Sequence, residues 1–351
     1  VFYMQENLVD DYGHKLNIDD VDKMRLVFGK LYFFLARAFL DSGFGKKGKE
    51  LLRKSLIEYA DKKNSIIKQQ FEGKLGKSEI LSVIVEDLSN NFQIRDTGEG
   101  KSAVKIIGSP VLSAWKELCS SNEQEIPQEY LTNVTCRLFE NNYENIKNPQ
   151  LFGFEDSETP ADEATIFVED RNSVLVDYSP RNISESDVPS LFRRCSDYWA
   201  YLYYFMAKNL LSVGKAGEAS LRKTIRDFGA HRGQILRRQV LASGKDTTIK
   251  TLFENYDLPE DPRFEQDLIR QDEEVRVSKE TRCNFSEVWG ELEDGWKIGK
   301  IYCEEVHHAF YSAFDPAIQV NITQTLTRGD DYCDFVLFLR ESNKFQIEQG
   351  W

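Results

Sequence analysis

The sequence has little that would place it in a membrane or on nucleic acid. None of its apolar runs approaches the roughly 18 consecutive residues that a membrane-spanning helix needs. Positive charge is also in short supply, because 45 basic residues against 58 acidic ones give a formal net charge of -13. The basic residues are scattered in pairs such as Arg237 and Arg238, and such a surface repels a phosphate backbone. We therefore expect neither a membrane nor a nucleic acid as partner.

Cysteine and histidine are sparse as well, with six cysteines and four histidines in 351 residues. The cysteines form no CxxC pair and no dense disulfide framework, and the first residues show no signal-peptide pattern. Glycine-rich phosphate loops and a G-x-S-x-G nucleophile motif are absent too. These absences predict a cytoplasmic protein with reduced thiols, and they argue against two common classes of enzyme.

The chain is long enough for two domains, and it contains an internal repeat. Residues 45–59 align with residues 214–228 at a constant spacing of 169 residues, and charge and size largely match at each position. An aromatic-rich segment with helical spacing precedes each stretch and is ended by glycine. Each copy therefore begins with two helices joined by a glycine turn. Further along, residues 92–108 and 264–281 are typical of antiparallel hairpins.

The second copy ends in two clear strands, 318–323 and 335–339, which together with its hairpin make a four-stranded antiparallel sheet. We therefore predict an α+β fold, a tandem repeat of a unit with helices packed on such a sheet. Residues 1–171 are predicted to form a degenerate, structural first copy, and residues 172–351 the second copy, which holds the active site. Because a duplicated unit can replace a two-fold homodimer, we expect the copies to pack as an intramolecular pseudo-dimer.

The densest polar cluster lies on a helix predicted at 297–314. One apolar stripe of this helix, at about 100° per residue, consists of Tyr302, Val306, Ala309 and Ala313. We expect this stripe to face the sheet. Cys303 and His307 are spaced i, i+4 at its edge, so the imidazole is expected to lower the pKa of the thiol. Glu304 and His308 form a second such pair farther round the helix.

A solvated helix face with ordinary histidines and a core cysteine is the plainer interpretation of this cluster. Against it, the matching positions of the first copy, between Leu131 and Cys136, hold no carboxylate or imidazole. No cofactor is predicted outright. A divalent metal is the alternative left open, held by Glu304, His307 and a carboxylate or thiolate from residues 330–333, although no HExxH spacing supports it.

Two further groups carry candidate chemistry. Asp330 and Cys333 belong to a turn at 327–335, which can be interpreted as a charged hairpin turn. Turn chemistry explains the glycine and one aspartate of this segment, but not the second aspartate or the cysteine. On the helix of the second copy that starts near residue 215, His231 and Arg232 lie together, and an arginine in a cleft is a natural clamp for a carboxylate. An exposed, salt-bridged helix is the plainer interpretation of the same residues.

The second copy resembles the L-2-amino-thiazoline-4-carboxylic acid hydrolase family. The residues that carry the resemblance are 222–233, 283–289, 299–307 and 325–335. The Gly-Asp-x-x-Cys-x-Phe ending, from Gly329 to Phe335, is also similar to the 4-vinyl reductase type of small-molecule-binding domain. Both resemblances imply helices on an antiparallel sheet.

The first resemblance implies a hydrolase that acts on a C–N or C–S bond of a cyclic amidine and opens a thiazoline ring to an N-carbamoyl cysteine, or a related ring-opening or lyase reaction. Either reaction would belong to amino-acid-derived, cysteine-linked metabolism or biosynthesis. Such chemistry needs a nucleophile or activated water, an acid and a cation for the substrate carboxylate. The implied nucleophile is Cys303 or Cys333, and the base is His307. The implied acid is Glu304 or Asp330, and the clamp is Arg232 or Arg328, beside His231.

Two other function classes fit the same sequence. A non-catalytic sensor or carrier with the vinyl-reductase-like fold would use the cluster to bind a small molecule or metal. A pure interaction module would have no pocket in either copy. Substitution of His307 separates a catalyst, which keeps affinity and loses turnover, from a binder, which loses affinity.

Overall fold

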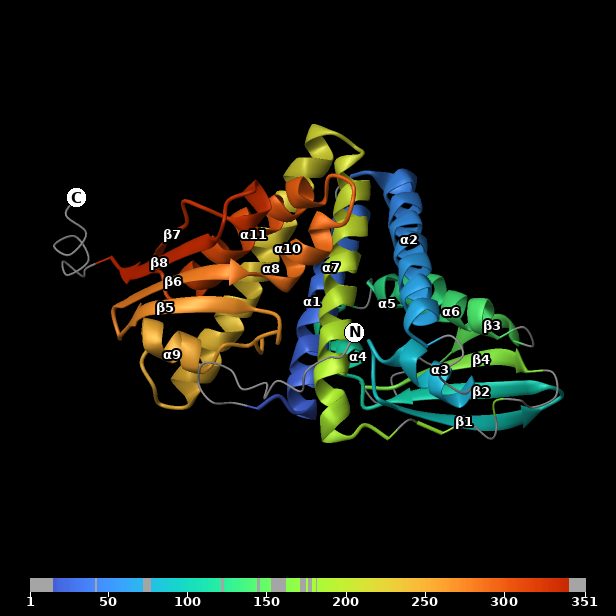
Figure 1. Cartoon of the computed structure of the whole chain (residues 1–351). Coiled ribbons are helices and arrows are strands. Elements are labelled where there is room, and N and C mark those ends of the chain that lie inside the picture. The colour runs from blue at the N-terminus through green and yellow to red at the C-terminus, as the bar shows by residue number, and fades with distance from the viewer. Residues whose placement is uncertain are drawn as a thin grey trace. The chain divides into compact units, whose positions relative to one another are not determined.

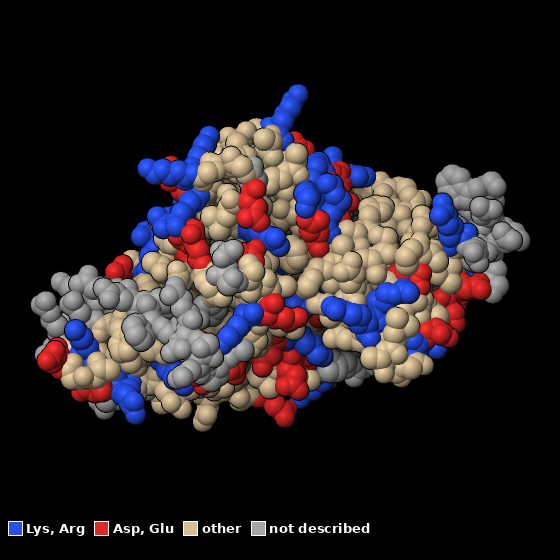
Figure 2. All heavy atoms as spheres, turned by 180° about the vertical axis from the view of Figure 1, so that it is seen from behind, with Lys and Arg blue, Asp and Glu red and all other residues tan. Residues whose placement is uncertain are grey.

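The computed structural model describes residues 15–41, 43–71, 77–120, 123–143, 146–152, 162–170, 175, 179–180 and 182–340. The chain forms two compact units, Val1–Asn209 and Leu210–Trp351. The boundary expected near residue 172 lies outside the described residues. No described helix combines the length and the apolar character that crossing a bilayer requires. On the described part of the face drawn in Figure 2, acidic and basic side chains are interspersed without a continuous basic stripe.

The first unit packs helices on a four-stranded antiparallel sheet with the strand order β1-β2-β4-β3 (Figure 1). Its strands are β1 (Asn91–Gly98), β2 (Lys101–Ile107), β3 (Ile146–Phe152) and β4 (Ala164–Asp170). Its helices are α1 (Ile18–Asp41), α2 (Gly45–Phe71), α3 (Lys77–Val85), α4 (Pro110–Leu118), α5 (Glu125–Tyr130), the π-helix η1 (Leu131–Cys136), α6 (Arg137–Asn142), the 3-10 helix η2 (Glu185–Asp187) and α7 (Val188–Leu211), which runs across the division between the units.

A buried polar network stabilises the interior of this first unit. Lys63 of α2 forms a 2.8 Å ion pair with Asp87, and both side chains are almost fully buried. The hydroxyl of Tyr130 donates to Asp87 at 2.5 Å. Arg194 of α7 donates two hydrogen bonds to Glu86, at 2.7 and 2.9 Å. Because buried charges are costly unless paired, these partners fix α2, α7 and the segment after α3 to one another.

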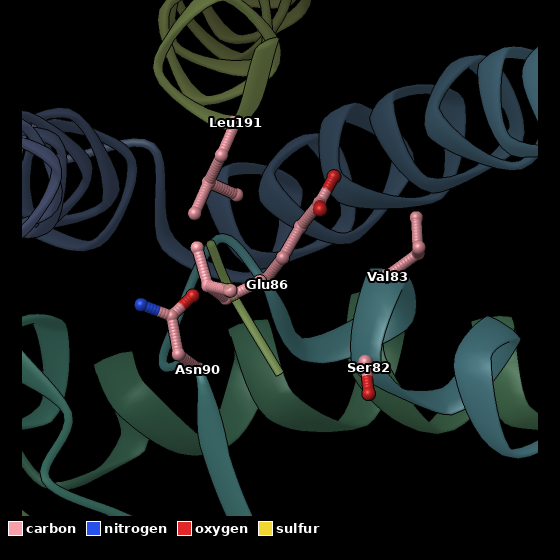
Figure 3. Close-up of a pocket in the computed structure, with 6 residues that line it drawn as sticks. Ser82, Val83, Glu86, Asn90 and Leu191 are labelled. Atoms are coloured by element: carbon pink, nitrogen blue, oxygen red, sulfur yellow. The ribbon is translucent and has the colours of Figure 1, made fainter. Parts of the chain in front are cut away.

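A cavity of about 10 Å³ lies beside this network, with room for about one water molecule. Figure 3 shows Glu86 at its centre, between Leu191 of α7 and Asn90. A cavity of this size is too small for a substrate. The Glu86 carboxylate is also already paired with Arg194.

The second unit has the same kind of sheet, with the order β5-β6-β8-β7 and antiparallel pairing throughout. Its strands are β5 (Glu265–Gln271), β6 (Val275–Arg282), β7 (Ile318–Asn321) and β8 (Cys333–Leu339). Its helices are α8 (Lys215–Ala242), α9 (Ile249–Glu254), α10 (Asn284–Gly290), α11 (Gly295–Phe314) and the 3-10 helix η3 (Leu326–Arg328). Helices and antiparallel sheets in both units confirm the predicted α+β class.

Helices α8 and α11 lie unusually close because α8 presents glycine to α11. A Cβ at Gly233 would lie 2.2 Å from the Phe310 oxygen, and one at Gly229 would lie 2.7 Å from the Val306 oxygen. The side chains of Ala309 and Ala313 meet the same two glycines. The apolar stripe of α11 therefore faces α8, and the prediction that it faces the sheet was wrong.

Candidate functional site

The floor of the candidate site is the inner face of strand β6. Side chains alternate along a strand, so Arg276, Ser278 and Glu280 point to one side. In the register of the sheet, Ser278 lies opposite Phe335 and Glu280 opposite Cys333 of β8. Cys333 and Phe335 belong to the hydrophobic core under the helices. Arg276 and Glu280 thus face the helical layer from a sheet surface that is partly polar.

The roof is the edge of α11 that carries Cys303, His307 and Tyr311, spaced four residues apart along the helix. The His307 ring lies 4.8 Å from the Phe335 ring, edge to face, and 6.1 Å from the Tyr311 ring. These contacts place the edge of α11 over β8. The structure therefore brings together Cys303, His307 and Cys333, three of the residues predicted from the sequence.

Burial governs the ionisation of this group. It raises the pKa of Cys303 to about 12, an effect that Cys283 reinforces and a hydrogen bond with Thr327 reduces. It raises the pKa of Cys333 as well, with Glu280 adding to the rise. Burial, aided by the charge of Arg232, lowers the pKa of His307 to about 3. The expected lowering of the Cys303 pKa by His307 was wrong, because the partly desolvated imidazole stays neutral and offers no charge to a thiolate.

Glu280 completes the group, and it was missed from the sequence. Burial raises its pKa to about 8, with Arg276 opposing and Glu260 adding to the rise. Its charge adds to the rise in the pKa of Cys303 and of Cys333, and the register of the sheet places it opposite Cys333. The available signal was the run of polar residues at positions 276, 278 and 280, every second residue of the predicted strand. A carboxyl group with a pKa near neutrality is a candidate acid or base.

Arg232, predicted as a substrate clamp, is bound within the protein. It donates two hydrogen bonds to Asp257, at 2.8 and 2.6 Å, and its guanidinium lies 4.9 Å from the Phe310 ring. Only 4% of the Arg232 side chain is exposed. Its charge still reaches the site, because it helps to lower the pKa of His307. His231 directly precedes Arg232 on α8 and is half-buried.

Glu304 and Arg328 form a separate ionic group. Glu304 accepts hydrogen bonds from Arg222 at 3.0 Å and from Arg328 at 3.3 Å. Burial acts to raise the pKa of Glu304, but these two arginines outweigh it and hold the pKa below its ordinary value. This carboxylate is therefore ionised near neutrality and poorly suited to donate a proton.

The turn before β8 is fixed by its acidic residues. Asp330 accepts a 2.7 Å hydrogen bond from the backbone N–H of Thr325, and Gly329 has a positive φ of 88° that favours glycine. The Leu326 N–H donates to the Cys333 sulfur at 3.3 Å. Asp330 thus shapes the loop that positions Cys333. Among the described residues, no set of three His, Cys, Asp or Glu side chains is arranged to hold a metal ion.

Comparisons with known proteins bear on this half of the chain. No curated protein matches the chain, and no solved structure does. A family model matches residues 191–337, a range that includes α8, α11, β6 and most of β8. The second half of the chain thus matches the L-2-amino-thiazoline-4-carboxylic acid hydrolase family, as the sequence resemblance predicted.

Proposed function

We propose that the second unit hydrolyses a small sulfur- and nitrogen-containing ring such as that of L-2-amino-thiazoline-4-carboxylate, and yields an N-carbamoyl cysteine. The observation that carries this proposal is the meeting of Cys303 and His307 on α11 with Cys333 and Glu280 on the sheet. All four lie in the segment that matches the hydrolase family. The chain is then a hydrolase of amino-acid-derived metabolism, and we keep the cytoplasm as its expected location.

The ionisation of the site favours attack by water over attack by a cysteine. Burial keeps the Cys303 and Cys333 thiols protonated at neutral pH, whereas thiolate is the reactive form of cysteine. His307 is neutral and therefore able to accept a proton from water as that water adds to the ring carbon between sulfur and nitrogen. The C–S bond then breaks, and the sulfur leaves as a thiol. Cys303 and Cys333 line the site in this scheme and do not attack the ring.

The test is thiol release from L-2-amino-thiazoline-4-carboxylate, followed with a colorimetric thiol reagent with and without chelator. His307→Ala should lower the rate by about 100-fold or more, since general base catalysis contributes this much. His308→Ala is the matched control, because His308 is the next residue of α11 and is exposed. Equal loss in both variants, or none in either, would contradict the role given to His307.

A sensor or carrier remains the second candidate, and the raised pKa values of the Cys303 and Cys333 thiols, which keep both protonated, are the observation that favours it. In that case His307→Ala weakens binding of the thiazoline, measured by calorimetry, and the wild-type protein releases no thiol. A hydrolase shows the opposite pattern, in which affinity is kept while turnover is lost.

We further propose that the first unit is a structural copy of the second. Lys63 and Arg232 are 169 residues apart, the spacing of the sequence repeat, and each forms a buried ion pair with an aspartate that follows the third helix of its copy. The strand orders of the two sheets correspond as well. The pseudo-dimeric pairing of the copies stays a prediction. If the first unit is structural, Lys63→Met lowers stability but leaves thiol release per folded molecule unchanged.

A further inference from the structure

We propose that Glu280 is the proton donor of the site, which contacts the substrate and protonates the sulfur that leaves when the ring opens. The inference rests on the proposed hydrolysis and assigns to it the acid that neither the sequence nor the family match supplies.

Glu280 lies on the inner face of β6, directly opposite Cys333, and its charge acts on groups of the opposing helix, Cys303 and Tyr311. The His307 ring packs on Phe335, which is two residues along β8 from Cys333. Glu280 and the imidazole therefore reach neighbouring points on the same face of the sheet. A base and an acid placed in this way can act on two atoms of one small ring.

Seven titratable or charged groups interact electrostatically with Glu280. They are Arg276 on β6, Tyr256 and Glu260 before β5, Cys283 after β6, Cys303 and Tyr311 on α11, and Cys333 on β8. Only Arg276 in this set favours the ionised carboxylate, and burial outweighs it, leaving the pKa at about 8. The carboxyl group is therefore mostly protonated at pH 7 and ready to give up its proton.

Glu304 and Asp330, the two acids that the family resemblance implies, each bind other groups of the protein. Two arginines keep Glu304 ionised, and Asp330 accepts the backbone N–H of Thr325. Neither contact exists for Glu280, whose environment favours the neutral acid. A neutral carboxylic acid is the form that a leaving thiolate needs beside it.

Water adds to the ring carbon and gives one proton to His307, while the ring nitrogen takes a proton from solvent as its double bond to that carbon becomes a single bond. The hydroxyl group on the tetrahedral carbon then loses its proton to solvent as the C–O double bond forms. The C–S bond breaks in the same step, and the sulfur takes the proton of Glu280. The proton on His307 then returns to Glu280 through solvent. One water is consumed, one thiol and one urea-type group are formed, and no oxidant or reductant is needed.

The experiment compares thiol release by the wild-type protein, Glu280→Gln, Glu280→Asp and the control Glu273→Gln between pH 5 and 10. Glu273 is an exposed glutamate in the turn of the same hairpin. The wild-type rate should fall above about pH 8, where Glu280 ionises. Glu280→Gln should lose about 100- to 10,000-fold in kcat and lose this pH dependence, while Glu280→Asp regains part of the rate. Circular dichroism and binding of the thiazoline to Glu280→Gln check that the variant is folded.

Two other outcomes overturn the inference in different ways. A wild-type protein that turns over while folded Glu280→Gln keeps the same rate and pH profile refutes the role of Glu280 and leaves the hydrolase standing. A wild-type protein that releases no thiol at any pH refutes the hydrolase on this substrate, and the role of Glu280 falls with it.

Discussion

Replacing Gly233 with alanine should destabilise the second unit, because this residue sets the distance between α8 and α11. The new Cβ would lie 2.2 Å from the Phe310 oxygen and 3.0 Å from the Phe314 nitrogen, whereas ordinary contacts start at 3.4 Å. Both atoms belong to the backbone, so the helices must separate by about 1 Å. Overpacking of this kind costs about 1–3 kcal/mol, and the better helix propensity of alanine offsets about 1 kcal/mol.

We expect a net loss of about 1 kcal/mol, and at most about 2 kcal/mol, in the free energy of unfolding for Gly233→Ala, and a smaller loss for Gly229→Ala, where the contact is 2.7 Å. Urea unfolding followed by circular dichroism measures both. Gln234→Ala is the control, because Gln234 is exposed on the same helix and should change stability by less than about 0.5 kcal/mol. A Gly233→Ala protein as stable as the wild type would refute the reasoning that glycine permits this close packing.

Three further predictions follow from the ionisation of the site. Asp257→Asn leaves the buried Arg232 without its charged partner and should cost about 3 kcal/mol by urea unfolding; a loss below about 1 kcal/mol would show that the pair is not needed. Because burial raises the pKa of Cys303 to about 12, its alkylation by iodoacetamide, followed by mass spectrometry, should be slow at pH 7 and still rising at pH 10; a plateau near pH 7 would contradict this. Because the pKa of His307 is lowered to about 3, the rate of thiol release should stay constant from pH 7 down to pH 5, whereas an ordinary imidazole would lose activity near pH 6.5.

The periodicity of the sequence predicted much of the frame of the site. The helix expected at 297–314 is α11 over Gly295–Phe314, and Cys303 and His307 do share one edge of it. The hairpins expected at 92–108 and 264–281 are β1–β2 and β5–β6. These features depend on local spacing along one segment, which is written in the sequence itself.

Interactions between distant segments could not be predicted in the same way. Glu304 and Arg328 were given separate roles, yet they bind each other across 24 residues. Glu280 was missed because a polar residue on a strand is usually on the solvent side, and only its pairing opposite Cys333 of the core shows that it lies on the inner face of the sheet.

The sequence by itself determined the α+β class, the edge of α11 that bears Cys303 and His307, and the family of the second half, because each depends on residue types at fixed local spacings. The tertiary structure decided which face of α11 meets the sheet, which acid stands beside the thiols, and whether those thiols are ionised. The physical reason is that burial, and with it the desolvation that shifts a pKa, depends on every segment packed around a group and has no local signature.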